Sequence, residues 1–347
     1  SSYEATCGDL EYTVLLGPSV LEVTRRFAWL CGGTALPPLW SLGYSGSTMS
    51  YTDAPDAQER MRSFLQLCAA HEVPCSSFQL SSGYTSIGTK RYVFNWNRDK
   101  FPDPAAFAAE FAAAGLMLAA NIKPCLLTDH PLYSECRETG LFLGESGAAG
   151  EGGSAPPPET SMFWDAVGSH LDFTNPATAA WWREQVREQL LDLGIGSTWN
   201  DNNEWRVEDE GAVCHGFGTP TPLRLVRPVQ ALLMVRASLE AQRAHAPTLR
   251  PWLISRSGMP GTQRYAQTWS GDNYTSWHTL KHNVRMGLGL SLSGFFNTGH
   301  DVGGFAGPAP EPELFVRWVQ NGVFHPRFTI HSWNTSLDGT PDGTCNE

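Results

Sequence analysis

The sequence is poor in charge, and poorest in basic residues. Only 17% of its 347 residues are charged, and 24 lysines and arginines stand against 35 aspartates and glutamates, for a net charge of −11. Because no basic block offsets this balance, the composition argues against nucleic acid or an anionic membrane surface as a partner. A neutral ligand fits the composition better.

Motifs of several common protein classes are also missing. The eight cysteines include no C-x-x-C pair, which argues against a zinc framework. No apolar run is long enough to predict a transmembrane helix, and the sequence leaves the compartment open. No G-x-S-x-G surrounds a serine, so the elbow of a serine hydrolase is not indicated.

Short apolar runs do alternate with helical patterns from about residue 39 onward. The expected strands are 39–44, 75–80, 116–122, 196–200, 252–255, 265–269, 292–297 and 328–332, and the expected helices are 57–71, 102–115, 175–193, 228–245, 275–288 and 312–321. This alternation predicts right-handed crossovers and a parallel sheet. A closed (β/α)8 TIM barrel is the natural candidate. An open doubly wound sheet has the same alternation, but no G-x-G-x-x-G follows the first strand.

Two regions lie outside this alternation. Residues 11–16 resemble a stray strand, which we interpret as the remnant of an N-terminal β-sandwich within 1–35, followed by a linker helix. Residues 36–347 would form the barrel, with a mobile Gly/Pro-rich surface insertion at about 144–159. No helix is expected after the eighth strand, so the barrel is expected to be incomplete and the chain truncated on both sides.

Acidic side chains stand beside tryptophan where expected strands end. Residues 199–204 (WNDNNE) and 269–273 (WSGDN) close the fourth and sixth strands, and 299–305 (GHDVGGF) close the seventh. In a barrel, such positions point into the mouth. Paired carboxylates there suggest glycoside hydrolysis, in which one carboxylate attacks the anomeric carbon and one acid protonates the leaving oxygen. The alternative is that these aspartates are helix N-caps.

These segments resemble the signatures of glycoside hydrolase family 31. Residues 199–204 are similar to the family's W-x-D-x-N-E, and 269–273 to its W-x-G-D-N. The similarity continues in the same order along nearly the whole chain, at 36–44 (LPPLWSLGY), 101–104 (FPDP), 172–176 (DFTNP), 256–257 (RS), 300–305 (HDVGGF) and 326–332 (PRFTIHS).

The resemblance implies roles for individual residues. Asp201 would be the nucleophile that forms a covalent glycosyl-enzyme, and Asp272 the general acid/base. Arg256, His331 and Asp301 would hydrogen-bond sugar hydroxyls. Trp199, Trp269 and Phe305 would form apolar walls, and Trp164 would add to these walls or simply pack. No metal and no organic cofactor is expected.

Two departures from the family pattern bear on the substrate. Where many members carry D-I-D-Y after the second strand, this sequence has 79–84 (QLSSGY), so that Gln79 replaces a carboxylate. The family's D-P after the third strand is Lys123-Pro124 here. A neutral Gln79 and a cationic Lys123 would change the hydrogen bonding around the 4- and 6-positions of the sugar. They point to another sugar, an acidic substituent or transfer to an unusual linkage.

The expected function is a retaining α-glycosidase that hydrolyses terminal α-linked glycosides, most simply α-glucosides, by double displacement. An α-glucosyltransferase, an α-galactosidase or other α-glycosidase, and an α-glucan lyase are alternatives within the family. An inactive fragment or a non-catalytic carbohydrate-binding barrel is the alternative from another class. The expected partners are an oligosaccharide or α-glycoside substrate and the flanking β-domains of a longer parent chain.

Overall fold

Eight parallel strands close into a barrel in the computed structural model, which describes residues 11–147, 156–164 and 166–347. Each strand pairs with the next along the chain, and β1 pairs with both β2 and β16, so the ring has no open edge. The predicted TIM barrel is therefore confirmed, and the doubly wound alternative is excluded. The strands are β1 (Tyr44–Thr48), β2 (Cys75–Leu80), β5 (Met117–Ile122), β9 (Ser197–Asn200), β12 (Leu253–Ser255), β13 (Gln267–Trp269), β14 (Thr298–Val302) and β16 (Arg327–Asn334).

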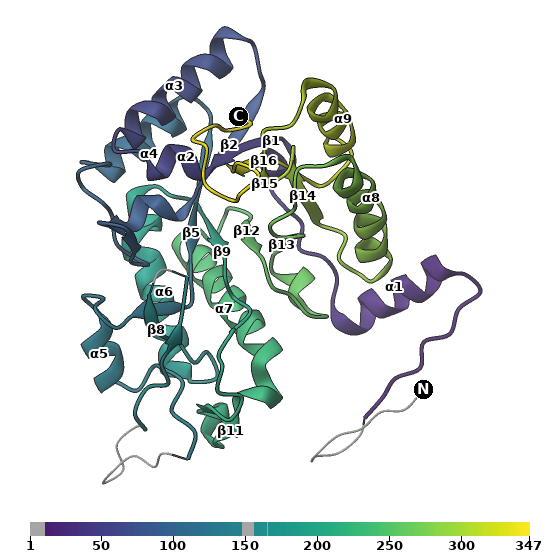
Figure 1. Ribbon diagram of the computed structural model, residues 1–347. Helices are drawn as coiled ribbons and strands as arrows, with labels where there is room; N and C mark the ends of the chain where they lie inside the picture. The colour runs from purple at the N-terminus through teal and green to yellow at the C-terminus, as the bar shows by residue number, and fades with distance from the viewer. Residues whose placement is uncertain (1–10, 148–155, 165) are drawn as a thin grey trace.

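Helices cover the outside of the barrel, with α3 and α4 on one side and α8 and α9 on the other (Figure 1). Their apolar faces pack on the strands because a parallel barrel is buried on both faces. No helix follows β16 in the described part of the chain. The helices after the first strand are α2 (Met49–Asp53), α3 (Ala57–Ala70), α4 (Pro104–Ala113), α5 (Tyr133–Glu138), α6 (Pro176–Gln189), α7 (Leu223–His245), α8 (Trp277–Leu292) and α9 (Pro312–Gly322).

Local sequence fixes where several helices begin. Asp103, Asn175 and Ser276 each accept a hydrogen bond from a backbone N–H in the first turn of α4, α6 and α8. Proline follows the first two caps, where a missing N–H costs nothing. These signals are short-range, so the sequence placed these starts within two residues.

Two predicted strands were misplaced. Residues 39–44 were expected to form the first strand, but Leu39–Leu42 is a 3₁₀ turn and β1 begins at Tyr44. β1 (YSGST) has almost no apolar side chains. At Gly46 the Phe64 and Phe78 rings press against the backbone, and an added Cβ would lie 2.6 Å from the Phe64 ring. The pattern of apolar residues therefore did not reveal that β1 is buried.

The seventh strand was placed too early, at 292–297. α8 runs to Leu292, and the strand is β14, whose sequence TGHDV is buried but mostly polar. Residues 11–16 are also not a strand in the structure. They precede α1 (Val20–Cys31), whose Thr24 hydroxyl donates to the Leu292 carbonyl at the end of α8. A short segment that pairs with no neighbouring strand lacks the partners a sheet needs.

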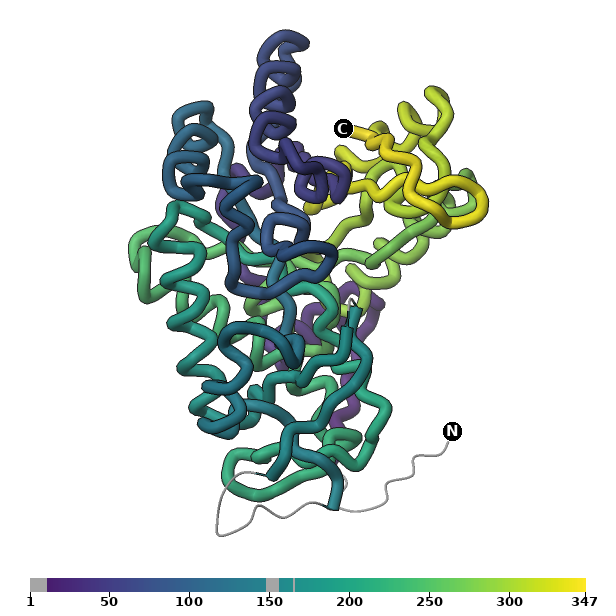
Figure 2. The backbone as a smooth tube through the Cα atoms, turned by 60° about the vertical axis from the view of Figure 1, so that its left-hand side comes forward, coloured from purple at the N-terminus to yellow at the C-terminus, as the bar shows by residue number. Residues whose placement is uncertain are grey.

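Loops after β5 and β9 build up one end of the barrel. The first carries β6 (Cys125–Leu127), β7 (Ser161–Met162) and β8 (Val167–His170), and the second carries β10 (Val213–Cys214) and β11 (Thr221–Pro222). A backbone bridge joins Gly144 to Val213, so the two loops lie side by side (Figures 1 and 2). Of the expected insertion at 144–159, residues 148–155 lie outside the described residues.

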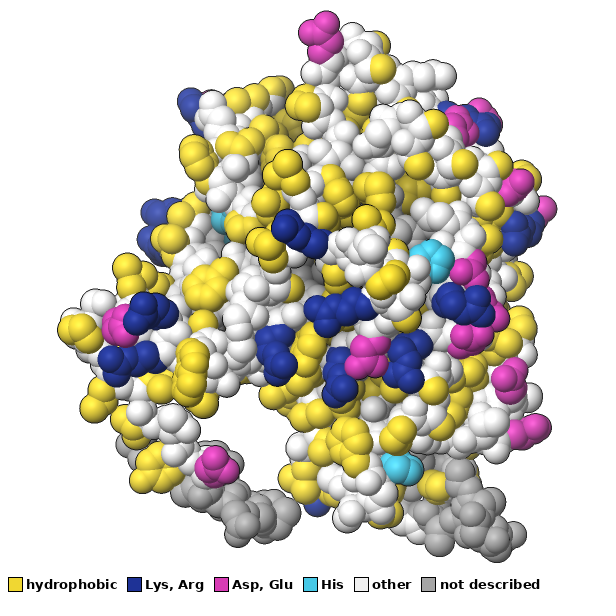
Figure 3. Space-filling model, turned by 180° about the vertical axis from the view of Figure 1, so that it is seen from behind, with side chains coloured by type: hydrophobic (Ala, Val, Ile, Leu, Met, Phe, Trp, Pro, Cys, Tyr) yellow, Lys and Arg dark blue, Asp and Glu magenta, His cyan; other side chains and the backbone are white. Residues whose placement is uncertain are grey.

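The surface away from the viewer in Figure 1 mixes exposed apolar side chains with lysine and arginine (Figure 3). On α1, Val20, Leu21 and Trp29 are all more than half exposed. In the described part of the chain, no helix is long and apolar enough to cross a membrane.

Candidate active site

The carboxyl ends of all eight barrel strands contribute residues to a cavity of about 270 Å³. Nine of the eleven predicted site residues line it, and they come from widely separated parts of the sequence. These are Lys123, Trp164, Trp199, Asp201, Arg256, Trp269, Asp272, Phe305 and His331. The barrel thus brings together most of the residues that the motifs indicated.

Asp201 lies directly after β9, at the inner end of the cavity. Its backbone N–H bonds the Ile122 carbonyl at 2.9 Å, which ties the residue to the end of β5. Its carboxylate Oδ2 accepts hydrogen bonds from Lys123 Nζ at 2.7 Å and from Asn121 Nδ2 at 3.0 Å. Burial raises the pKa of Asp201, but the Lys123 ammonium and then the Arg256 guanidinium outweigh it and lower that pKa to about 2. Asp201 is therefore an anion.

Asp272 follows β13, and the guanidinium of Arg256 lies between its carboxyl group and that of Asp201. Arg256 Nη1 lies 3.5 Å from Asp201 Oδ1 and 3.4 Å from both carboxyl oxygens of Asp272. Burial raises the pKa of Asp272, Arg256 opposes this, and the Asp201 anion raises the pKa further. The environment thus moves the pKa values of the two carboxyl groups apart. It keeps Asp201 ionised and favours the protonated form of Asp272.

Aromatic side chains form the cavity wall around His331. The Trp199 ring meets the His331 ring edge-on at 4.9 Å, and Phe305 stacks on His331 at the same centroid distance. Trp269 packs edge-on against Trp199 at 5.7 Å. Ser47 Oγ holds the imidazole Nδ1 at 2.9 Å, and burial lowers the pKa of His331 to about 3. The ring is therefore neutral.

Trp164 forms a second wall, from the loop that carries β7. It is 44% exposed, so it borders the cavity rather than packing in the core. The Arg91 guanidinium lies over its ring at 4.2 Å, and Lys123 Nζ lies 5.3 Å from the ring centroid. These two cations fix the plane of the indole at the cavity's edge.

Two predicted residues do not line the cavity. Gln79 is completely buried inside the barrel, where its amide donates to Ser45 Oγ and Thr329 Oγ1. Asp301 is also completely buried and pairs with Arg327 at 2.9 Å. The residues that line the cavity after β2 are Ser81 and Ser82.

Residues not singled out in the sequence complete the lining. They are Met49, Ser81, Ser82, Asn121, Asn202, Arg206 and Trp333. A signal for some of them was present. Asn121 stands two residues before Lys123, and Ser81 two after Gln79, and such spacing places side chains on one face of a strand.

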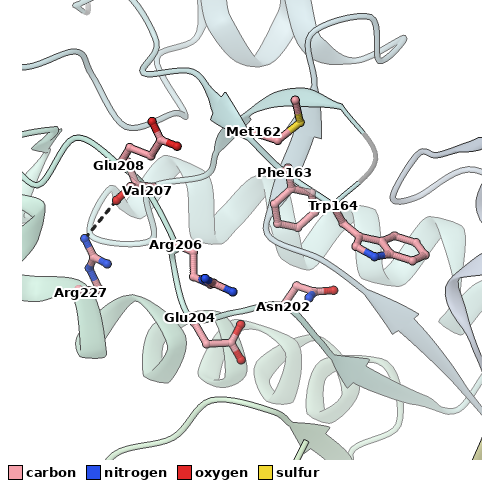
Figure 4. Close-up of a pocket in the computed structure, with 9 residues that line it drawn as sticks. All are labelled: Met162, Phe163, Trp164, Asn202, Glu204, Arg206, Val207, Glu208 and Arg227. Atoms are coloured by element: carbon pink, nitrogen blue, oxygen red, sulfur yellow. Dashed lines mark hydrogen bonds between the residues drawn. The ribbon is translucent and has the colours of Figure 1, made fainter. Parts of the chain in front are cut away.

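A larger cavity of about 460 Å³ opens next to the first and shares Trp164, Asn202 and Arg206 with it. Figure 4 shows the Arg206 side chain reaching into the space framed by Phe163, Trp164, Asn202 and Glu204. Arg206 is exposed and has no hydrogen-bond or ion-pair partner among the described residues. The two cavities together form a cleft with a narrow inner and a wide outer part.

Within 11–147, 156–164 and 166–347, no group of three or more His, Cys, Asp or Glu side chains is arranged to hold a metal ion.

A closed (β/α)8 barrel whose mouth holds two facing carboxyl groups between aromatic walls defines a class of carbohydrate-active barrel. The family model for the glycosyl hydrolases family 31 TIM-barrel domain matches residues 34–343. The chain belongs to this family.

Known relatives agree with this assignment. The chain is 33% identical over 337 residues to neutral alpha-glucosidase AB of Sus scrofa, covering 94% of this chain and 34% of the relative. It is 30% identical over 346 residues to alpha-glucosidase 2 of Bacillus thermoamyloliquefaciens, covering 95% and 41%. The chain thus spans about a third of the length of the first of these relatives.

Solved structures give the same fold. The barrel matches the structure of an ER glucosidase II complex, of a catalytic subunit with the binding domain of a regulatory subunit, with a TM-score of 0.80 and 26% identity. That match covers 93% of this chain and 34% of the other. A GH31 alpha-xylosidase from a soil metagenome, at 22% identity, has the same TM-score and so shares the fold.

Proposed function

We propose that this chain is the catalytic barrel of a retaining α-glycosidase that hydrolyses terminal α-glucosides. One observation carries the proposal. Two carboxyl groups contact the same guanidinium nitrogen, and their surroundings lower the pKa of Asp201 and raise that of Asp272. Glycoside hydrolysis by double displacement requires one ionised carboxylate as the nucleophile and one protonated carboxylic acid for the leaving group.

In the first step, the Asp201 carboxylate attacks the anomeric carbon while the bond to the leaving oxygen breaks. The proton of the Asp272 carboxylic acid passes to that oxygen. In the second step, water attacks the anomeric carbon and gives its proton to Asp272, and the bond from the carbon to Asp201 breaks. Both acids then regain their starting protonation states.

The remaining cavity residues would bind the sugar. The neutral His331 can donate or accept through Nε2, and the Arg256 guanidinium supplies fixed donors. Trp199, Trp269 and Phe305 offer apolar surface for the C–H faces of a pyranose ring. Gln79 and Asp301 would support this layer from below, because both are buried outside the cavity.

The outer cavity would hold the leaving group. It begins at Trp164 and Arg206, which border both cavities, and it is larger than the inner one. A single sugar would therefore fill the inner cavity while further sugars extend outward. The similarity to two α-glucosidases supports glucose as the inner sugar.

We also propose that residues 36–347 are the catalytic domain and that residues 1–35 precede it. The match of the family model from residue 34 supports this boundary.

Incubation with 4-nitrophenyl α-glucoside, followed by NMR of the first sugar released, tests the proposal. Retention predicts α-glucose as the first product. The Asp201→Asn variant should lose turnover while remaining folded, as circular dichroism would show. First release of β-glucose, or substantial activity of Asp201→Asn, would overturn the assignment of Asp201 as nucleophile. A parallel set of α-galactoside, α-xyloside and α-N-acetylgalactosaminide identifies the preferred sugar.

A further inference from the structure

The side chain of Lys123 points at Asp201 rather than into open space. Lys123 Nζ donates to Asp201 Oδ2 at 2.7 Å and also bonds the side-chain oxygen of Asn202. Only 10% of each side chain in the Lys123–Asp201 pair is exposed. A buried ammonium in this position is held by the carboxylate that attacks the sugar.

The two oxygens of Asp201 have different surroundings. Oδ2 accepts two hydrogen bonds, from Lys123 Nζ and from Asn121 Nδ2. Oδ1 has one long contact of 3.5 Å, to Arg256 Nη1, and that nitrogen also contacts Asp272. Oδ1 is therefore the oxygen with a free lone pair on the side of the acid/base.

We infer that Lys123 is a positioning residue that fixes Asp201 through Oδ2 and leaves Oδ1 as the attacking oxygen. The inference rests on the proposed function and specifies how its nucleophile is held. Lys123 would thus act through Asp201 rather than on the sugar.

Lys123 would also change the balance between the two chemical steps. A cation beside Oδ2 stabilises the carboxylate, which makes Asp201 a weaker nucleophile and a better leaving group. In the first step the Oδ1–carbon bond forms, the bond to the leaving oxygen breaks and Asp272 gives up its proton. In the second step the Oδ1–carbon bond breaks, and the returning negative charge spreads onto Oδ2 beside Lys123. The cation therefore favours the second step.

Removing the ammonium should raise the pKa of Asp201, because Lys123 is the strongest of the influences that lower it. Because Asp201 must be ionised to attack, kcat/KM falls as the pH drops through the pKa of Asp201. A higher pKa therefore moves this fall in kcat/KM to higher pH. The other charged or titratable groups that face Asp201 are Arg256, Glu204, Arg206, Asp272, Asp301 and His331. They are unchanged by substitution of Lys123.

The test compares Lys123→Met, which removes the charge at similar size, with Lys123→Arg, which keeps it. In the wild type, kcat/KM should fall only at low pH, because Lys123 and Arg256 lower the pKa of Asp201 to about 2. In Lys123→Met this acid limb of kcat/KM should move up by about 1–3 pH units, whereas Lys123→Arg should stay near the wild type. With 4-nitrophenyl α-glucoside, Lys123→Met should also show a burst of nitrophenol, because the glycosyl-enzyme is released more slowly. Lys281→Met, an exposed substitution on α8 at the outside of the barrel, is the matched control.

An acid limb that is the same in Lys123→Met and the wild type would overturn the inference while leaving the proposed function intact. A wild-type protein inactive on every α-glycoside would overturn the proposed function, and this inference with it. If Lys123→Met does not fold, the double variant Lys123→Met/Asp201→Asn should regain the fold, because it leaves no carboxylate without its cation. A double variant as unstable as the single one would contradict the proposed pairing.

Discussion

The Asp301 carboxylate accepts a hydrogen bond from Arg327 Nη1 at 2.9 Å, and essentially no part of either side chain reaches solvent. Arg327 begins β16, and its guanidinium lies 5.5 Å from the centre of the Trp269 ring. The pair therefore lies beneath an aromatic wall of the cavity. This explains why Asp301, although next to the mouth in sequence, supports the site from below.

Breaking this pair should be costly. Asp301→Asn should lower the free energy of unfolding by about 3–5 kcal/mol, because it leaves the buried Arg327 guanidinium without its partner. Urea unfolding followed by tryptophan fluorescence measures the change. Arg236→Met is the matched control, since it removes an exposed pair with Glu240 at 2.8 Å and should cost only about 0.3–0.5 kcal/mol. Equal costs at both sites would contradict the structural role of the buried pair.

The acid role of Asp272 predicts a dependence on the leaving group. Asp272→Ala should reduce kcat/KM for a disaccharide by about 10²–10⁴-fold, because its leaving oxygen needs a proton. The loss should be much smaller for 4-nitrophenyl α-glucoside, whose leaving group departs as an anion. Glu204→Gln serves as the control, because Glu204 bonds Arg256 at 3.0 Å and its loss should slow both substrates alike. A similar loss for both substrates in Asp272→Ala would count against the acid role.

The pH profile should also depend on the substrate. The first step needs protonated Asp272, so kcat/KM for a disaccharide should fall as pH rises through the Asp272 pKa. That pKa lies above its usual value because burial and the Asp201 anion outweigh Arg256. For an activated aryl glycoside this basic limb should be nearly flat. A basic limb that survives in Asp272→Ala would show that another group titrates there.

Arg206 should matter for longer substrates. It borders both cavities, and its guanidinium reaches into the outer one (Figure 4). Hydrogen bonds from a charged donor contribute about 1.5–3 kcal/mol, so Arg206→Met should lower kcat/KM for a trisaccharide by about ten- to a hundredfold. The effect on an aryl monosaccharide should be much smaller. Arg243→Met, on the exposed end of α7, is the control, and equal effects on both substrates would place Arg206 in the inner site instead.

Depth in the barrel is where the sequence-based prediction of the site was weakest. Gln79 in β2 and Ser81 just after the strand are two residues apart, but Gln79 is buried inside the barrel and Ser81 lines the cavity. The layers inside a barrel are set by how neighbouring strands are staggered. That stagger is a relation between strands distant in sequence, so no local pattern reports it.

Burial of polar strands was the other weakness. β1 (YSGST) and β14 (TGHDV) carry small or polar residues and yet are almost entirely buried. Their side chains find partners on other strands, as Ser47 does with His331 and Asp301 with Arg327. A search for apolar runs therefore shifted both strands toward the nearest hydrophobic residues.

By itself, the sequence determined the barrel, the positions of most helices and the presence of Asp201 and Asp272 at strand ends. These depend on periodicity, caps and short motifs, which act within a few residues. Only the tertiary structure decided that Lys123 holds Asp201, that Arg256 contacts both carboxyls, and that Asp301 pairs with Arg327 below the cavity. Each of those contacts joins residues on or next to different strands. Barrel closure and the stagger of neighbouring strands, rather than local sequence, decide which of these residues come into contact.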